Sequence, residues 1–157
     1  MREVLSAPSA GDEVMSIAER LKGNIRVAEG RCPHGHSLMS DAKRFDSERA
    51  IALRVRNAGR EGMIFLNPFY GRFEYECDIE LKRGDIVELS CPECGVSLAI
   101  DERCKLCDIP MFAVQLPDGG QVEACPAVGC HNHSLTIVDL DTQLERMYVD
   151  DEQKFKL

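Results

Sequence analysis

The chain has 157 residues, of which 44% are hydrophobic and 29% charged, a composition typical of one globular domain and not of a disordered chain. Its net charge of −8 argues against a nucleic-acid partner, because binding a polyanion requires a basic face. The longest apolar run is far short of the roughly 20 residues of a membrane helix. Charges also interrupt the first fifteen residues, where a signal peptide would be apolar. We therefore expect a cytoplasmic protein without a membrane segment.

The first residues predict a flexible lead and then a helix. We assign residues 1–10 to the lead. Ser9 and Asp12 have the spacing of a capping box, in which both side chains satisfy free amides of the first helical turn. Apolar residues then recur at helical spacing, and a glycine follows them: Val14, Ile17, Ala18, Leu21 and Gly23. This pattern predicts one short amphipathic helix.

The remainder predicts antiparallel β-strands, so that the fold class is mainly β (small α+β). We expect strands at residues 24–28, 51–56, 63–66, 73–81, 86–89, 111–116, 121–124 and 134–140, separated by turns at 57–62, 82–85 and 117–120. Residues 73–81 alternate strictly between apolar and acidic side chains, which predicts a long half-buried strand with Cys77 as a core residue. Residues 142–157 are expected to form a tail or a short helix.

Two C-x2-C pairs predict the first metal site. They read "CPECG" at 91–95 and "CKLCD" at 104–108. Two residues between thiols allow both sulfurs to reach one ion, and a second such turn completes a tetrahedron. We expect Cys91, Cys94, Cys104 and Cys107 to bind one ion, with a tight hairpin at 95–103 between the pairs.

Over about residues 86–115 these pairs resemble the zinc-ribbon, or rubredoxin-like, class of four-cysteine sites. The resemblance implies either a structural zinc or an iron that transfers one electron, since a tetrahedral all-sulfur site suits both metals. The scarcity of aromatic residues beside the pairs favours zinc.

The histidines predict a second metal site. All four lie beside a cysteine, in "RCPHGH" at 31–36 and in "CPAVGCHNH" at 125–133. We expect the ligands to be Cys32, His36, Cys125 and Cys130, with His34 or His133 as alternatives to His36. His131 is expected to act outside the coordination shell. This second site would tie both ends of the β segment together, giving a single domain over 11–141 with the ribbon nested inside it.

The function expected from these residues is structural. No nucleophile elbow, phosphate loop or dinucleotide fingerprint is present in the sequence. Through "CPHGHSL", "CPECGVSL" and "GCHNHSLTIVDLD" the chain resembles a family of small bacterial Cys/His-rich zinc proteins. Its "CPECG" is also similar to one in the zinc-bearing subunits of acetone-carboxylase-type complexes.

We therefore expect two Zn²⁺ per chain and a non-catalytic subunit or accessory protein of a larger enzyme assembly, with a protein partner. The alternatives are an iron electron carrier or redox sensor at Cys91, Cys94, Cys104 and Cys107, and a nucleic-acid-binding zinc ribbon. Catalysis at the second site is a weaker alternative, because three thiolates reduce the Lewis acidity of an ion.

Overall fold

A computed structural model describes residues 3–4 and 25–137, and the predicted helix and the tail at 142–157 lie outside these residues. The described part is mainly β, as predicted. Its elements are β1 (Glu3–Val4), β2 (Met39–Phe45), β3 (Glu48–Asn57), β4 (Arg60–Leu66), β5 (Tyr75–Cys77), β6 (Glu88–Ser90), β7 (Ala99–Arg103), β8 (Pro110–Gln115), the short 3-10 helix η2 (Pro117–Gly119), β9 (Gln121–Ala124) and β10 (His133–Ile137). Two residues of the predicted lead thus form β1.

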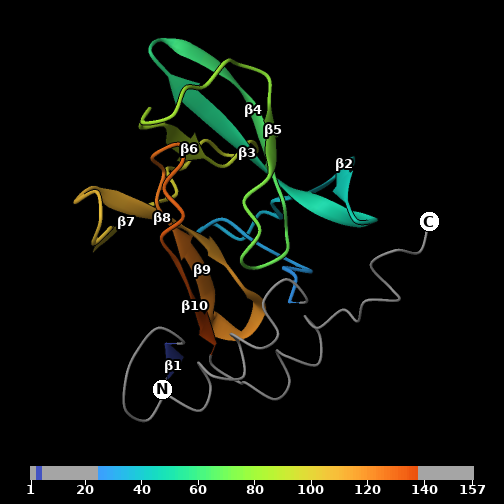
Figure 1. Cartoon of the computed structure of the whole chain (residues 1–157). Helices are drawn as coiled ribbons and strands as arrows, with labels where there is room; N and C mark the ends of the chain where they lie inside the picture. The colour runs from blue at the N-terminus through green and yellow to red at the C-terminus, as the bar shows by residue number, and fades with distance from the viewer. Residues whose placement is uncertain (1–2, 5–24, 138–157) are drawn as a thin grey trace.

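The strands form two antiparallel sheets. One has the order β2-β3-β4-β5, with β6 also paired to β3, and the other has the order β1-β10-β9-β8-β7. Figure 1 shows the long β3–β4 hairpin at one end of the molecule and β9 and β10 towards the other. Strands that are adjacent in sequence pair in most places, so the sheets are largely built from consecutive hairpins.

One apolar core extends across both sheets. It includes Leu53 and Val55 of β3, Val114 of β8, and Leu38 and Leu98 of the connecting segments, all with at most 2% of their surface exposed. The sequence of β3 explains its place in this core. Arg54 and Arg56 point outward as predicted, whereas residues 50–53 are buried without alternation. The first half of β3 is therefore covered on both faces.

The predicted strand at 73–81 is much shorter than expected. Only β5 pairs with β4, and Phe73 and Tyr75 are partly exposed. After Cys77 the Asp78 N–H still donates to the Met63 carbonyl at 2.9 Å, but the Met63 N–H donates to the Asp78 carboxylate at 3.0 Å and not to a strand carbonyl. Cys77 itself is half-buried and packs against the core, in line with its predicted role.

Two other predicted elements differ from the structure. Residues 25–28, the described part of the predicted strand at 24–28, form no strand, and Arg26 and Phe69 make an isolated β-bridge there. Residues 95–103 do not fold into a hairpin between the C-x2-C pairs. They contain β7, which pairs with β8 beyond the second pair.

The chain segments that follow Cys32 and Cys91 repeat one local arrangement. In each, a serine hydroxyl accepts from the N–H two residues on, in Ser37–Met39 and Ser97–Ala99. The next residue, Leu38 or Leu98, is buried, and its carbonyl accepts from a following strand, Ala52 N–H or Ala113 N–H. The "SL" after each of these two cysteine motifs therefore fixes that motif to the core.

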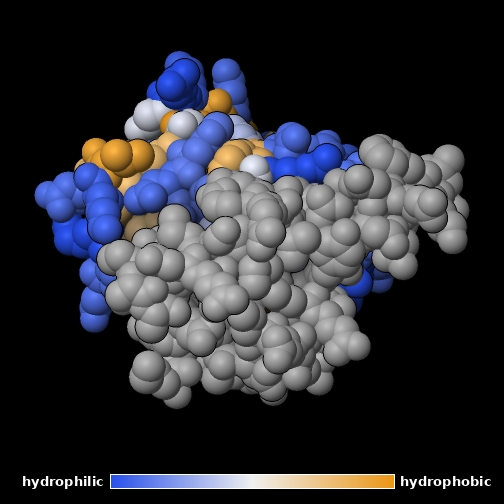
Figure 2. Space-filling model, turned by 60° about the horizontal axis from the view of Figure 1, so that its bottom comes forward, coloured by the Kyte–Doolittle hydropathy of each residue, from blue (hydrophilic) through white to orange (hydrophobic). Residues whose placement is uncertain are grey.

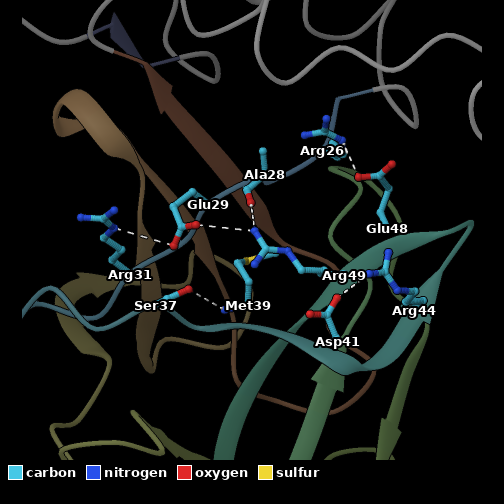
Figure 3. A network of polar contacts seen from close by, with 10 residues as sticks. All are labelled: Arg26, Ala28, Glu29, Arg31, Ser37, Met39, Asp41, Arg44, Glu48 and Arg49. Carbon is cyan, nitrogen blue, oxygen red and sulfur yellow. Dashed lines mark hydrogen bonds and ion pairs between the residues drawn. The ribbon is translucent and has the colours of Figure 1, made fainter.

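A polar network holds the irregular segment that leads to Cys32. Figure 3 shows Glu29 between Arg31 and Arg49, with Arg49 also donating to the carbonyl of Ala28 at 2.9 Å. Arg26 pairs with Glu48 at 2.7 Å. These contacts attach the segment to β3 where strand hydrogen bonds are missing.

Among the residues that the structure describes, no helix has the length and apolar character needed to cross a membrane. On the face shown in Figure 2, apolar residues are visible between hydrophilic ones.

Candidate metal centres

The eight predicted ligands lie in two clusters, each able to hold a metal ion. Cluster A consists of Cys32, His36, Cys91 and Cys94, and cluster B consists of Cys104, Cys107, Cys125 and Cys130. Within each cluster the ligand atoms lie within 4.8 Å of one another. Four ligand atoms that converge in this way match a tetrahedral site with Zn–S bonds of about 2.3 Å and Zn–N bonds of about 2.0 Å.

The grouping differs from the predicted one. The sequence predicted Cys91 and Cys94 with Cys104 and Cys107, and Cys32 and His36 with Cys125 and Cys130. In the structure the motifs pair in chain order, first with second and third with fourth. The physical reason is β7, which lies between the two C-x2-C pairs as a strand and directs them to different clusters.

Cluster A joins the segment before β2 to the segment after β6. Cys32 Sγ lies 3.4 Å from His36 Nδ1 and 3.9 Å from Cys94 Sγ. The backbone N–H groups of His34 and His36 donate to Cys32 Sγ at 3.3 and 3.4 Å. Gly35 has a φ of +89°, which places its N–H on the Cys32 carbonyl and closes the turn.

The cysteines of cluster A differ in their tendency to ionise. Burial of Cys32 opposes ionisation, but hydrogen bonds from the His36 backbone, the His36 ring and the His34 backbone outweigh it and lower the pKa of the thiol to about 6. Burial raises the pKa of Cys91. Cys32 therefore ionises more readily than Cys91, which favours Cys32 as the first thiolate to bind an ion.

Cluster B joins the segment after β7 to the segment after β9. Cys104 Sγ lies 3.8 Å from Cys130 Sγ and accepts from the Cys107 backbone N–H at 3.4 Å. Asp108 takes the place that Gly95 has in cluster A. Each donates its N–H to the carbonyl of the first cysteine, and each has a positive φ, +56° and +76°.

Asn132 contacts cluster B, a role that was not predicted from the sequence. Its side-chain N–H₂ donates to Cys104 Sγ at 3.2 Å, and its backbone carbonyl accepts from the Cys125 backbone N–H at 3.1 Å. The polar residue between two histidines in "CHNH" was the only signal in the sequence. Asn132 therefore links the two halves of the cluster.

The thiol pKa values of cluster B follow the same pattern as those of cluster A. Burial of Cys104 opposes ionisation, but the Asn132 amide and the backbone N–H groups of Cys107 and Leu106 outweigh it and lower its pKa to about 6. The hydrogen bond with Cys130 raises the pKa of Cys107, and burial raises that of Cys125. A bound dication would reverse these increases by compensating the thiolate charges.

The two clusters contact different parts of the core. Cys32 and Cys91 of cluster A belong to the main core. Cys104 and Cys125 of cluster B form a separate small core with Met111, against which Ile100, Ile109 and Ala127 pack. Loss of an ion would therefore affect the main core at cluster A and a local region at cluster B.

The remaining histidines lie in neither cluster. His34 Nδ1 is 3.5 Å from Cys94 Sγ, at the edge of cluster A. His131 stacks on Phe73 with ring centroids 4.1 Å apart, and the His133 ring packs edge-on against Tyr70 and Phe73. His133, the predicted alternative ligand, is thus an aromatic contact, and so is His131.

These aromatic residues border an apolar cavity of about 540 Å³ between the two sheets. Its walls include Leu66, Val87, Val114 and Val122. The loop from Cys125 to Cys130 forms a further wall, so the fourth ligand motif contributes to the cavity as well as to cluster B.

The donor sets indicate structural metal sites. Each cluster offers at least three sulfur ligands, and soft thiolates select zinc, Cu(I) or iron–sulfur chemistry over magnesium or calcium. All eight cysteines are free of disulfide bonds, so each thiol is available as a ligand. A fully protein-ligated tetrahedral ion has no open position for a water, unlike a catalytic zinc.

No protein-family model matches the chain, and no curated protein or solved structure is significantly similar to it.

Proposed function

We propose that this protein is a zinc-binding structural protein that carries two Zn²⁺ ions and serves as a non-catalytic subunit or accessory protein of a larger assembly. The observation that supports it is the convergence of eight side chains into two four-ligand clusters, of which cluster A has two cysteines in the main core. An ion at each cluster would join segments that are distant in sequence, and its binding energy would stabilise the fold. Eight free cysteines agree with the reducing cytoplasm as its location.

Elemental analysis of the untagged protein, purified without chelators, tests the metal content. We expect two zinc ions per chain and no visible absorbance. A chain that folds with no bound metal would contradict the proposal. One ion per chain would contradict it as well, because only one cluster would then be a metal site.

Support for a protein partner comes from exposed apolar residues beside cluster B. Leu106 lies between Cys104 and Cys107 and is 78% exposed, and Ile86, which is 57% exposed, pairs with Ala127 of the fourth ligand motif. An ion in cluster B would hold these residues rigidly, which suits a contact with another protein.

Affinity purification from the native host tests this partner. We expect a stoichiometric partner that is retained by the wild-type chain and by the control Tyr75→Ser, and lost with Leu106→Glu. Purification of the wild-type chain without a stable partner would contradict the subunit role.

A second candidate is a one-electron iron site in cluster B. The observation that favours it is the pair of N–H donors on Cys104 Sγ, from Cys107 and Asn132, because hydrogen bonds to sulfur tune the reduction potential of such a site. The all-cysteine set in the structure is Cys104, Cys107, Cys125 and Cys130, whereas the sequence predicted Cys91, Cys94, Cys104 and Cys107. Anaerobic purification of a coloured, iron-containing protein would support this candidate, and a colourless protein would exclude it.

A further inference from the structure

The His34 ring lies beside Cys94, which is already a ligand of cluster A. Its Nδ1 lies 3.5 Å from Cys94 Sγ, although the two residues are 60 positions apart in sequence. Its backbone N–H donates to Cys32 Sγ at 3.3 Å. The imidazole therefore lies beside the sulfur of one ligand while its backbone is fixed to another.

Cys94 is the cysteine of cluster A that is most open to loss. Cys32 and Cys91 are buried, whereas Cys94 is exposed. An exposed thiolate is the first to meet protons, alkylating agents or oxidants. If its sulfur leaves the ion, one corner of the tetrahedron opens next to the His34 ring.

We propose that His34 is a reserve ligand of cluster A, which binds the ion in place of Cys94 whenever the Cys94 sulfur leaves it. The proposal rests on metal binding at cluster A, as proposed above. The exchanged set would be Cys32, His34, His36 and Cys91, two sulfurs and two nitrogens, which is a common structural zinc set.

The local backbone leaves room for this exchange. Gly35, between the two histidines, has a φ of +89°, and a Cβ built on it would meet nothing within 4 Å. The turn is therefore not packed against neighbouring side chains at this point. His34 itself is exposed, so its ring can move towards the ion without a change in the core.

Cluster B provides a matched comparison within the same chain. Its exposed cysteine is Cys107, and the side chain that donates to its sulfurs is the amide of Asn132, bonded to Cys104. An amide is a poor zinc ligand, while imidazole is a good one. Loss of the exposed cysteine should thus leave the ion bound in cluster A and release it from cluster B.

Metal content of purified variants, measured with zinc and with Co²⁺ as a spectroscopic probe, tests the proposal. We expect two ions per chain for wild type, His34→Ala and Cys94→Ala, and one ion for the double variant Cys94→Ala/His34→Ala. Cys107→Ala should retain one ion, and the control double variant Cys94→Ala/His131→Ala should retain two. Cobalt in Cys94→Ala should keep its tetrahedral visible bands and lose part of its thiolate charge-transfer band.

The outcomes separate this inference from the metal-binding function. If wild type holds fewer than two ions, the proposed function itself is wrong. If wild type holds two and Cys94→Ala holds one, His34 is not a reserve ligand, and Cys94→Ser repeats the test should the alanine variant be insoluble. Loss of an ion in His34→Ala would also overturn the proposal, because His34 would then be a primary ligand. Two ions in Cys107→Ala would overturn it too, because tolerance of a lost cysteine would then not be specific to cluster A.

Discussion

In each cluster the cysteine whose pKa is lowered, Cys32 or Cys104, accepts several hydrogen bonds at its sulfur. Cys32 and Cys104 are both buried, which by itself would raise their pKa values, and the N–H donors around them reverse that effect. Only Cys104 has an amide side chain among its donors, that of Asn132. Asn132 lies two positions after Cys130 in the sequence, yet its amide donates to the sulfur of Cys104, which belongs to a different ligand motif.

Asn132→Ala should accelerate release of the ion from cluster B by about 10–100-fold, because donors to a metal ligand commonly change affinity by that factor. Stopped-flow zinc release to a chromogenic chelator should show one of two phases accelerated. Asn57→Ala, which removes an amide bonded to Asp85, is the matched control and should leave both phases unchanged. Equal acceleration of both phases in Asn132→Ala would indicate general destabilisation.

The two acidic thiols also predict the pH dependence of metal affinity. Above about pH 6 Cys32 and Cys104 are already ionised and release no proton on binding, whereas below it each must lose one. As the pH falls, metal affinity at each cluster should therefore decrease more steeply below pH 6 than above it. The additional decrease is about tenfold per pH unit. Competition titrations with a chelator between pH 5 and 8 check this, and a constant slope across the range would contradict the assigned pKa values.

At the scale of the element, the recurrent unit is a tight ligand turn followed by a strand. Gly95 and Asp108 end equivalent turns with positive φ, and Ser37–Leu38 and Ser97–Leu98 fix two of the turns to the core in the same way. The turn closes because the residue after the second cysteine donates its N–H back to the first cysteine's carbonyl. Glycine accommodates this conformation without steric cost.

Gly95→Ala should destabilise the zinc-loaded protein by about 1–2 kcal/mol, the cost of the left-handed region for a residue with a Cβ. A Cβ at this position would meet nothing within 4 Å, so the effect is conformational and not a clash. Urea denaturation measures it. Glu93→Ala, in the same turn and exposed, is the control, and an equal loss in both variants would exclude the backbone explanation.

At the scale of the whole molecule, the order in which the ligand motifs pair determines which parts of the chain each cluster joins. Pairing in chain order means that cluster A closes the first half of the described chain and cluster B the second. The two halves are then held together by the core shared between the sheets, and not by an ion that spans both ends.

Paired cysteine variants distinguish this grouping from the nested grouping predicted from the sequence, in which Cys91 and Cys104 bind the same ion. Cys32→Ser/Cys91→Ser should retain one ion, because both changes fall in cluster A, whereas Cys91→Ser/Cys104→Ser should retain none. The nested grouping predicts the reverse for the second variant, one remaining ion. Metal content of the two purified proteins decides between them.

The sequence by itself determined the eight ligand candidates, because each is a thiol or imidazole at a spacing that one tight turn can bring to an ion. It also determined the mainly-β class and most strand positions, because alternation and turn residues are local signals. Which ligand motifs share a cluster was decided only in the tertiary structure. That choice depends on β7 forming a strand paired with β8, and on Asn132 reaching Cys104, contacts between residues that no local pattern relates.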